Sequence, residues 1–283
     1  MLCLIEADPF LFRPNQLKKR LLALDDLDIA FGNSHAEDSA RRVHPLLHHR
    51  AKALERRLEA ANAALYQSVR SDIVRNSQPR ALLQWLEDAA SDSGPCPLPG
   101  LGFDYRDEFV SGVLPLPEPG EPNQQLSPEM VPYQPTPVRH ILRLVKAAMI
   151  SGNDVFMDLG SGLGHVPLLV SMITGARSLG IEMQPAYVVS ARECARNLRM
   201  KRVQFIAQDA RDADLSRGTV FYLYSPFKGS ILDNVLDALQ KESRHRPIKI
   251  CSLGPCTHRI LNETWLSASS VPGTGSISVF NSR

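Results

Sequence analysis

The chain has 283 residues, of which 43% are hydrophobic and 22% charged, and its formal net charge is +2. These values are typical of a soluble globular protein with one large domain or two smaller ones. So small a net charge is no indication of nucleic acid as a partner, because only clustered charge would form a binding surface. No run approaches the roughly 20 apolar residues of a membrane-spanning helix, so no membrane association is expected.

The cysteines and the N-terminus indicate a cytoplasmic protein. Five cysteines are an odd number, and their scattered spacing fits neither a close-spaced zinc pair nor a redox motif. We interpret them as free thiols in a reducing compartment and expect no metal site. The stretch Met1–Phe12 is apolar but carries Glu6 and Asp8 without a preceding basic segment, so it is a poor signal peptide.

Residues 1–90 are expected to form an N-terminal helical domain that acts as a lid or in substrate recognition. The clearest helix is predicted over Val43–Ile73, where apolar residues recur at three-, four- and seven-residue intervals. A second, shorter amphipathic helix is predicted over Arg80–Ala89, directly after a proline. His44 and His48 have the spacing of helical metal ligands, but no further ligand group is in register. We therefore interpret them as part of a solvated helix face.

Pro and Gly recur every few residues in the segment 91–125, which predicts an irregular connector. One piece of it, Tyr105–Leu114, is interpreted as ordered. A loop of this length inside a compact chain is usually functional or a linker. We place the domain boundary near Gln125 and expect the connector to lie near the mouth of the active site.

After Pro137 helical and strand patterns alternate. Helices are predicted at Val138–Ile150, Val166–Thr174, Ala186–Leu198 and Ile231–Gln240. Strands are predicted at Val155–Leu159, Ser178–Glu182, Val203–Ala207, Val220–Tyr224 and Ile248–Leu253. This alternation implies crossover connections and therefore an α/β fold with a doubly wound, mostly parallel sheet. A last strand, Ile277–Phe280, is expected to pair with the segment around Trp265 as a terminal hairpin.

The first of these strands ends in an acidic residue and passes into a glycine-rich turn. Asp158 is followed by glycine at every second position, in Gly160, Gly162 and Gly164, and then by the next helix. Glycines let the backbone bend sharply and approach a ligand closely, with the N–H groups of the helix pointing at it. Alone, such a turn indicates only a nucleotide-type site.

Two further acids follow the next two strands. Glu182 ends the second strand, where a carboxylate can accept both hydroxyls of a ribose. Asp209 follows the third strand and is placed to reach an adenine amino group. Because ligands of doubly wound sheets bind at the carboxyl ends of the strands, the three acids predict one shared site.

These segments resemble motifs I, II and III of the class I S-adenosylmethionine methyltransferases. The matching segments are Asp158–Gly164, Gly180–Glu182 and Gln208–Ala210. The run from Asp158 to His165 is similar to the non-SET (Dot1-type) histone lysine methyltransferases and their bacterial relatives. The resemblance implies a Rossmann-like, seven-stranded methyltransferase domain at residues 126–283 with S-adenosyl-L-methionine as cofactor. The cofactor-binding residues that it implies are Thr136, Asp158, Gly160, Ser161, Gly162, Gly164, Glu182, Asp209 and Ala210.

Two flanking segments are expected to surround the transferred methyl group. Tyr133–Pro137 resembles the short pre-motif that, in the Dot1-type enzymes, packs on the methionine end of the cofactor. Tyr224–Phe227 departs from the Asn-rich motif of those enzymes and is closer to the (Asp/Asn)-Pro-Pro-(Tyr/Phe) motif of amine methylators. The carbonyl of Tyr224 or Ser225, or the Ser225 hydroxyl, would orient the acceptor. The predicted methyl-transfer residues are Tyr133, Ser225, Pro226 and Phe227.

The predicted reaction is methyl transfer from S-adenosylmethionine to an amine or a hydroxyl, with protein lysine among the candidate acceptors. No strong general base is evident, which favours a nucleophile that needs little help with deprotonation. One alternative is an NAD-dependent oxidoreductase, although Val166-Pro167 stands where the dinucleotide fingerprint has its last glycine. Another is a non-catalytic protein that binds an adenosyl ligand. The sequence leaves open whether the acceptor is a protein or a small molecule, and a homodimer is compatible with it.

Overall fold

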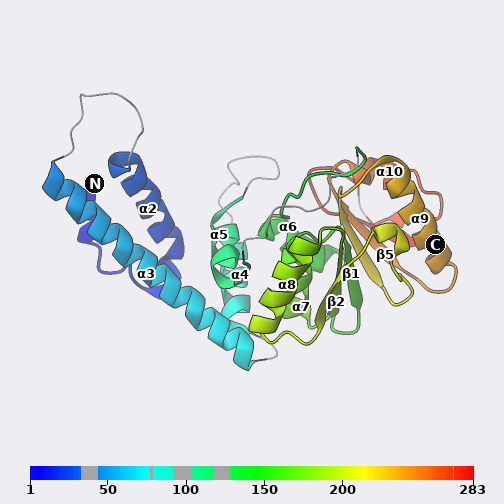
Figure 1. Cartoon of the computed structure of the whole chain (residues 1–283), viewed down its shortest axis with the longest axis horizontal. Coiled ribbons are helices and arrows are strands. Elements are labelled where there is room, and N and C mark those ends of the chain that lie inside the picture. Colours follow the sequence, from blue (N-terminus) through cyan, green and yellow to red (C-terminus); the bar gives the residue numbers. More distant parts are fainter. Residues whose placement is uncertain (33–43, 77–78, 92–102, 118–127, 270) are drawn as a thin grey trace.

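The computed structural model describes residues 1–32, 44–76, 79–91, 103–117, 128–269 and 271–283, and for 87–91 it describes the backbone alone. Most of the expected connector, with the boundary near Gln125, lies outside the described residues, as does Cys96. Figure 1 shows the first helices at one end of the molecule and the sheet with its covering helices at the other. No helix in the described part is long and apolar enough to cross a membrane.

A seven-stranded sheet forms the centre of the C-terminal part. In chain order its strands are β1 Val155–Leu159, β2 Arg177–Glu182, β3 Val203–Ala207, β4 Val220–Tyr224, β5 Lys249–Leu253, β6 Leu266–Ala268 and β7 Ser278–Ser282. Their spatial order is β3-β2-β1-β4-β5-β7-β6. The first five are parallel, whereas β7 runs antiparallel to both β5 and β6. The predicted parallel sheet and terminal hairpin are therefore confirmed.

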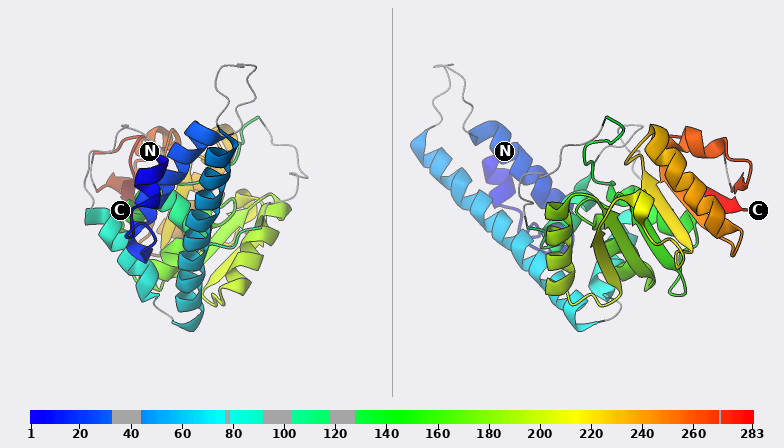
Figure 2. Two further views of the ribbon diagram at one scale, coloured as in Figure 1. Left: turned by 90° about the vertical axis from the view of Figure 1, so that its left-hand side faces the viewer. Right: turned by 45° about the vertical axis from the view of Figure 1, so that its right-hand side comes forward.

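Helices cover both faces of this sheet, as the second view in Figure 2 also shows. One face packs on α6 Val138–Ala147, α7 His165–Thr174 and α8 Pro185–Asn197, and the other on α9 Gly229–Ser243 and α10 Cys256–Leu261. The alternation of side chains along each strand decides which face a residue joins. On β4, Tyr222 belongs to the first cluster and Phe221 and Leu223 to the second. The predicted α/β, doubly wound architecture is thus confirmed.

The N-terminal part is helical, as predicted. Its elements are α1 Leu2–Glu6, the short 3-10 helix η1 Pro14–Gln16, α2 Leu17–Phe31, α3 Pro45–Arg75, α4 Arg80–Ser91 and α5 Tyr105–Val113. Leu2, Leu27 and Leu54 belong to a small hydrophobic core within this helical part, at the end of α3 that is away from the sheet. The other half of α3, with α4 and α5, shares one hydrophobic cluster with α6, α7 and α8. The helical part and the sheet are therefore joined through a continuous core.

A buried arginine joins three segments of this helical part. The Arg20 side chain is fully buried, and its Nε donates to Asn62 Oδ1 at 2.6 Å. Its Nη1 donates to the carbonyls of Leu11 and Arg13 at 3.0 and 2.6 Å. Because a guanidinium holds its donors in a fixed fork, one side chain ties the N-terminal segment to both α2 and α3.

The carboxylate of Asp107 links α5 to the start of α6. One of its oxygens accepts the N–H of Asp104 at 2.7 Å as part of a capping box, and the other accepts the N–H of Val138 at 2.8 Å. Burial raises the pKa of this carboxyl group. Val138 directly follows the pre-motif Tyr133–Pro137, so this bond from α5 helps to fix the position of the pre-motif's C-terminal end.

The contact between α3 and α5 depends on the absence of a side chain at Gly112. A Cβ there would lie 2.2 Å from Cε2 of Tyr66 on α3. On the same side, Arg70 of α3 donates to the carbonyls of Gly112 and Val113 at 2.6 and 2.8 Å. The two helices are therefore in direct contact at the end of α5.

We expect Gly112→Ala to lower the thermal unfolding midpoint although alanine is the better helix former. Alanine favours a helix by about 1 kcal/mol over glycine. Overpacking costs roughly 1–3 kcal/mol, and here it would force Tyr66 away from α5. The matched control is Ser111→Ala on the exposed side of the same helix, which should not lower the midpoint. Thermal denaturation followed by circular dichroism measures both, and a Gly112→Ala protein as stable as wild type would contradict this packing argument.

Candidate functional site

A cavity of about 620 Å³ lies at the carboxyl ends of β1, β2, β3 and β4. The order of the strands reverses between β1 and β4, and doubly wound sheets bind their ligands at this switch point. The volume is in the usual range of small-molecule sites. Each predicted site residue lines the cavity apart from Gly162 and Gly164, which belong to the turn in its wall.

The glycine-rich turn after β1 has three left-handed residues, with φ of 94° at Gly160, 52° at Gly162 and 84° at Gly164. Only glycine adopts such angles without strain. Each one also lies under a side chain from elsewhere in the fold. A Cβ would lie 2.3 Å from Pro226 Cβ at Gly160, 2.1 Å from Tyr133 Cε2 at Gly162 and 2.5 Å from Phe205 Cε1 at Gly164.

Glu182, at the end of β2, fixes the turn to the neighbouring strand. Its Oε2 accepts the N–H of Gly162 at 2.8 Å, and its Oε1 accepts the N–H of Gln184 at 2.9 Å. The carbonyl of Ile181 accepts two more N–H groups of the turn, from Gly160 and Ser161. A carboxylate has about four lone-pair directions, so each oxygen keeps capacity for a ligand hydroxyl.

Asp158 lies at the floor of the cavity and is almost fully buried. Burial raises the pKa of its carboxyl group well above the ordinary value, and the nearby charge of Glu182 adds to this. The two acids predicted from successive strands are therefore close enough to influence each other. A cationic group beside this buried carboxyl group would stabilise its charged form.

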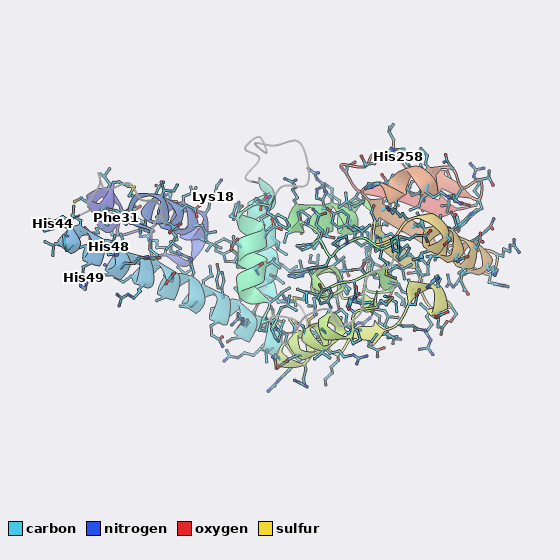
Figure 3. All side chains as sticks on the ribbon, turned by 45° about the horizontal axis from the view of Figure 1, so that its top comes forward. Lys18, Phe31, His44, His48, His49 and His258 are labelled. Carbon is cyan, nitrogen blue, oxygen red and sulfur yellow. The ribbon has the colours of Figure 1, made fainter. Side chains whose placement is uncertain are left out.

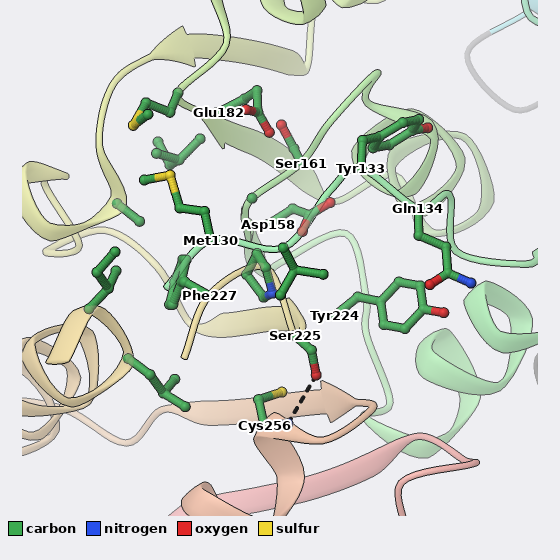
Figure 4. A pocket seen from close by; sticks show the side chains of 18 of the residues that line it. Met130, Tyr133, Gln134, Asp158, Ser161, Glu182, Tyr224, Ser225, Phe227 and Cys256 are labelled. Atoms are coloured by element: carbon green, nitrogen blue, oxygen red, sulfur yellow. Dashed lines mark hydrogen bonds between the residues drawn. The ribbon is translucent and has the colours of Figure 1, made fainter. Parts of the chain in front are cut away.

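The pre-motif Tyr133–Pro137 covers the turn (Figure 4). The Tyr133 ring lies on Gly162 and packs at 5.4 Å, centroid to centroid, against Tyr187 at the start of α8. Its hydroxyl lies 3.2 Å from Nδ1 of His165, the first residue of α7. Burial raises the pKa of Tyr133 and lowers that of His165 to about 4, so both side chains are neutral near pH 7.

Thr136 reaches the sheet rather than the turn. Its Oγ1 lies 3.2 Å from the hydroxyl of Tyr222, the β4 residue paired with Asp158 of β1. Both hydroxyls are buried, and both residues line the cavity. Thr136 therefore holds the pre-motif against the centre of the sheet.

The segment after β4 pairs with the chain just before the pre-motif. Met130 and Phe227 form an antiparallel bridge, and the N–H of Val131 donates to the Pro226 carbonyl at 3.1 Å. Glu129 then accepts the N–H groups of Ser230 and Ile231, at 3.2 and 3.1 Å, in the first turn of α9. The Ser230 hydroxyl also donates to Glu129 Oε2 at 2.8 Å, and this bond, followed by the two from the backbone, lowers the pKa of Glu129 because it stabilises the charged form.

Ser225 has a left-handed backbone with φ of 41°, which is unusual for a residue other than glycine. Its hydroxyl donates to the Leu253 carbonyl at 3.2 Å and accepts the N–H of Cys256 at 2.9 Å. The side chain therefore joins the end of β4 to the start of α10, as the dashed line in Figure 4 shows. In this structure the hydroxyl expected to face an acceptor is bonded to the protein itself.

Asp209 is likewise engaged by its neighbours. Arg211 holds it in a bidentate ion pair, with Nη2 at 2.7 Å from Oδ2 and Nε at 3.1 Å from Oδ1. The same carboxylate caps the short 3-10 helix η2 Ala210–Asp212 by accepting the N–H of Arg211. The Arg211 guanidinium lowers the pKa of Asp209. Any contact of Asp209 with an adenine would share the carboxylate with this arginine.

Sequence reasoning missed three large side chains of the cavity wall, those of Met130, Tyr187 and Tyr224. Tyr187 could have been found, because it lies in the first turn of the helix after Glu182, which must face the same sheet edge. Tyr224 ends a strand whose alternation puts it on the same face as Tyr222. Met130 had no comparable signal in the sequence.

The cavity fits the cofactor that the motifs imply. The Ser161 hydroxyl is buried at its wall and has no hydrogen-bond partner within the described part of the chain. Buried polar groups are nearly always paired in folded proteins, so this hydroxyl is suited to a polar ligand atom. The side chains of Glu182 and Asp158, which line the same cavity, provide the acceptors that an adenosyl group requires.

The three histidines with helical spacing lie far from the cavity. Figure 3 shows His44, His48 and His49 at the free end of α3. His44 Nδ1 accepts the N–H of Leu46 at 3.3 Å and so caps the helix. Within the described residues, no group of three or more His, Cys, Asp or Glu side chains is arranged to hold a metal ion.

Comparison with known proteins agrees with the motifs. Residues 129–222 match the sequence model of the family described as "Histone methylation protein DOT1". An RNA methyltransferase from Salinibacter ruber, solved with S-adenosyl-L-homocysteine, is 26% identical over 52% of this chain and 92% of that chain, with a TM-score of 0.43. The putative methyltransferase yhhF from Escherichia coli is 16% identical over 55% and 90% of the two chains, with a TM-score of 0.41. No curated protein matches the chain.

The family match includes the pre-motif, the glycine turn, Glu182, Asp209 and the first part of strand β4, up to Tyr222. These are the segments that the fold brings together around the cavity. Over residues 129–222 the chain is therefore similar to the family described as "Histone methylation protein DOT1", and the motifs in this stretch resemble those of the class I S-adenosylmethionine methyltransferases.

Proposed function

We propose that this protein transfers the methyl group of S-adenosylmethionine to an amine or hydroxyl acceptor, with an amine favoured. The observation that supports this is that two sets of residues meet at one cavity. The glycine turn with Glu182 forms one side of it, and the pre-motif with Tyr224–Phe227 forms the other. The first set suits the cofactor, and the second suits the group that receives the methyl.

For this reaction the protein mainly has to position the nucleophile and remove water from it. The cofactor, when bound, supplies an electrophilic sulfonium methyl group. The residues of this chain exclude water and align the nucleophile, which are effects that can supply much of the rate. Phe227 is buried against Met130, and Pro226 lies directly on Gly160, so this wall is apolar and rigid.

An amine is favoured because the cavity lacks a good base for a hydroxyl. His165 has a pKa lowered to about 4 by burial, so it accepts a proton poorly near pH 7. Among the acids of the wall, Asp233 is paired with Arg259 at 2.7 Å and Asp209 with Arg211. Glu182 accepts two backbone N–H groups, and Asp158 is buried at the floor of the cavity. A neutral amine needs no deprotonation before attack, whereas a hydroxyl does. A protein lysine joins this class once its ammonium group, with an ordinary pKa of about 10.4, has lost its proton to solvent.

The nicotinamide alternative has less support. Its sheet is typically parallel throughout in the order 3-2-1-4-5-6. Here an antiparallel strand, β7, lies between β5 and β6. The first turn of the helix after the glycines also has Val166 and Pro167, directly after His165, where a dinucleotide site has its third glycine. A measurement of turnover distinguishes the non-catalytic alternative from an enzyme.

We expect Gly162→Ala to abolish or strongly weaken cofactor binding. An alanine at φ of 52° is strained, and its Cβ would displace the Tyr133 ring from the turn. The matched control is Gly175→Ala, which has a similar φ of 71° but nothing within 4 Å of the new Cβ. Calorimetric titration with S-adenosylmethionine should show a loss of at least tenfold in affinity for the first variant and little change for the second. Equal affinities of the two variants would mean that the packing of the Tyr133 ring on Gly162 is not required for cofactor binding.

Turnover tests the function itself. Incubation of the purified chain with methyl-labelled S-adenosylmethionine and fractionated cell lysate should place label in protein or in small molecules, and Gly162→Arg should remove it. Chromatography of the hydrolysed product beside N-methyl and O-methyl standards separates an amine acceptor from a hydroxyl acceptor. If cofactor binds but no S-adenosylhomocysteine forms, the protein is a binding protein and the proposed function is wrong. Binding of NAD in place of S-adenosylmethionine would support the oxidoreductase.

A further inference from the structure

Two tyrosines on one strand differ in what their hydroxyls contact. Tyr222 and Tyr224 lie two residues apart on β4, so both side chains project from the same face of the sheet. The Tyr222 hydroxyl is paired with Thr136 Oγ1 at 3.2 Å. The Tyr224 hydroxyl is buried and has no hydrogen-bond partner within the described part of the chain.

An unpaired buried hydroxyl destabilises a folded protein, because it has given up its bonds to water without replacing them. Such groups are rare in native structures and call for a specific explanation. Tyr224 lines the cavity together with Gln134 of the pre-motif. Figure 4 shows the ring extending from the end of β4 toward Gln134, on the side of the cavity away from Glu182. A ligand in this part of the cavity would supply the missing partner.

The neighbouring Ser225 does not offer an equivalent group. Its hydroxyl already makes two bonds, to the Leu253 carbonyl and to the Cys256 N–H. A Cβ on Gly254 would lie 2.7 Å from Ser225 Oγ and 3.5 Å from Tyr224 Cε2, so both side chains border the same glycine of the loop after β5. Freeing Ser225 for a substrate would break the cap of α10.

We propose that the Tyr224 hydroxyl, and not that of Ser225, contacts the nucleophilic group of the methyl acceptor. This inference rests on the proposed function and adds to it the residue that orients the acceptor. A phenol oxygen can accept a hydrogen bond from N–H or O–H, so the site selects acceptors whose nucleophile carries a hydrogen. Burial raises the pKa of Tyr224, so the phenol remains neutral and does not act as a base. A neutral, hydrogen-bearing amine is the acceptor class that matches it.

The first test compares the stability of the free protein. Tyr224→Phe removes an unpaired hydroxyl and should leave the thermal midpoint unchanged or raise it. Tyr222→Phe is the matched control on the same strand face, and it should lower the midpoint because Thr136 Oγ1 loses its partner. If Tyr224→Phe destabilises as much as Tyr222→Phe, the Tyr224 hydroxyl has a structural partner and the proposal is overturned.

The second test reads the acceptor side of the cavity without knowledge of the acceptor. Sinefungin is a cofactor analogue with an amine where the transferable methyl stands, and S-adenosylhomocysteine has neither group. The ratio of their affinities therefore reports a polar group near the methyl position. In Tyr224→Phe this ratio should shift against sinefungin by about tenfold, the size of one hydrogen bond to a charged donor, while S-adenosylhomocysteine binds as in wild type.

Ser225→Ala should keep the wild-type ratio. A ratio that falls in Ser225→Ala but not in Tyr224→Phe would assign the role to Ser225 and overturn the proposal. An unchanged ratio in both variants, with both ligands bound, would overturn it while leaving the proposed methyl transfer intact. If neither ligand binds the wild-type protein, the proposed function fails, and this inference fails with it.

Discussion

The close seating of other segments on the glycine turn is the constraint on which the site depends. Tyr133, Pro226 and Phe205 each occupy the space that a Cβ would take, at Gly162, Gly160 and Gly164 respectively. They come from the pre-motif, from the segment after β4 and from β3. Because protein interiors are close-packed, a single methyl group at any of these positions must push a whole segment outward. The turn thus sets how closely these three segments approach one another at the cavity wall.

Hydrogen bonds then hold these segments at that distance. Glu182 bonds the turn to β2, and Met130 and Phe227 bring the chain before the pre-motif beside the segment after β4. Glu129 caps α9 at the same place, although it lies about one hundred residues earlier in the chain. Acceptors from distant parts of the sequence satisfy N–H groups that the turn and the helix cannot pair themselves. The cavity is therefore built largely from backbone groups with fixed directions.

The sequence predicts the course of the backbone around the cavity better than the hydrogen-bond partners of its side chains. Strands β1, β3 and β4 were predicted to the residue, because buried apolar runs between turn residues define them. The position of Glu182 and of the glycines followed from the same strand ends. The roles of hydroxyls and carboxylates did not. Ser225 caps α10 and Asp209 pairs with Arg211, and neither partner can be read from local spacing because each depends on how loops meet in space.

The helical N-terminal part is connected to the site through a defined set of contacts. Asp107 of α5 accepts the N–H of Val138, immediately after the pre-motif, and α5 is itself held by Arg70 and Tyr66 of α3. A displacement of α3 would therefore act on the pre-motif before it acted on the sheet, since the strands are bonded to one another along their length. The pre-motif bears Tyr133 and lines the cavity together with Tyr224, so the helical part adjoins the cavity through the pre-motif.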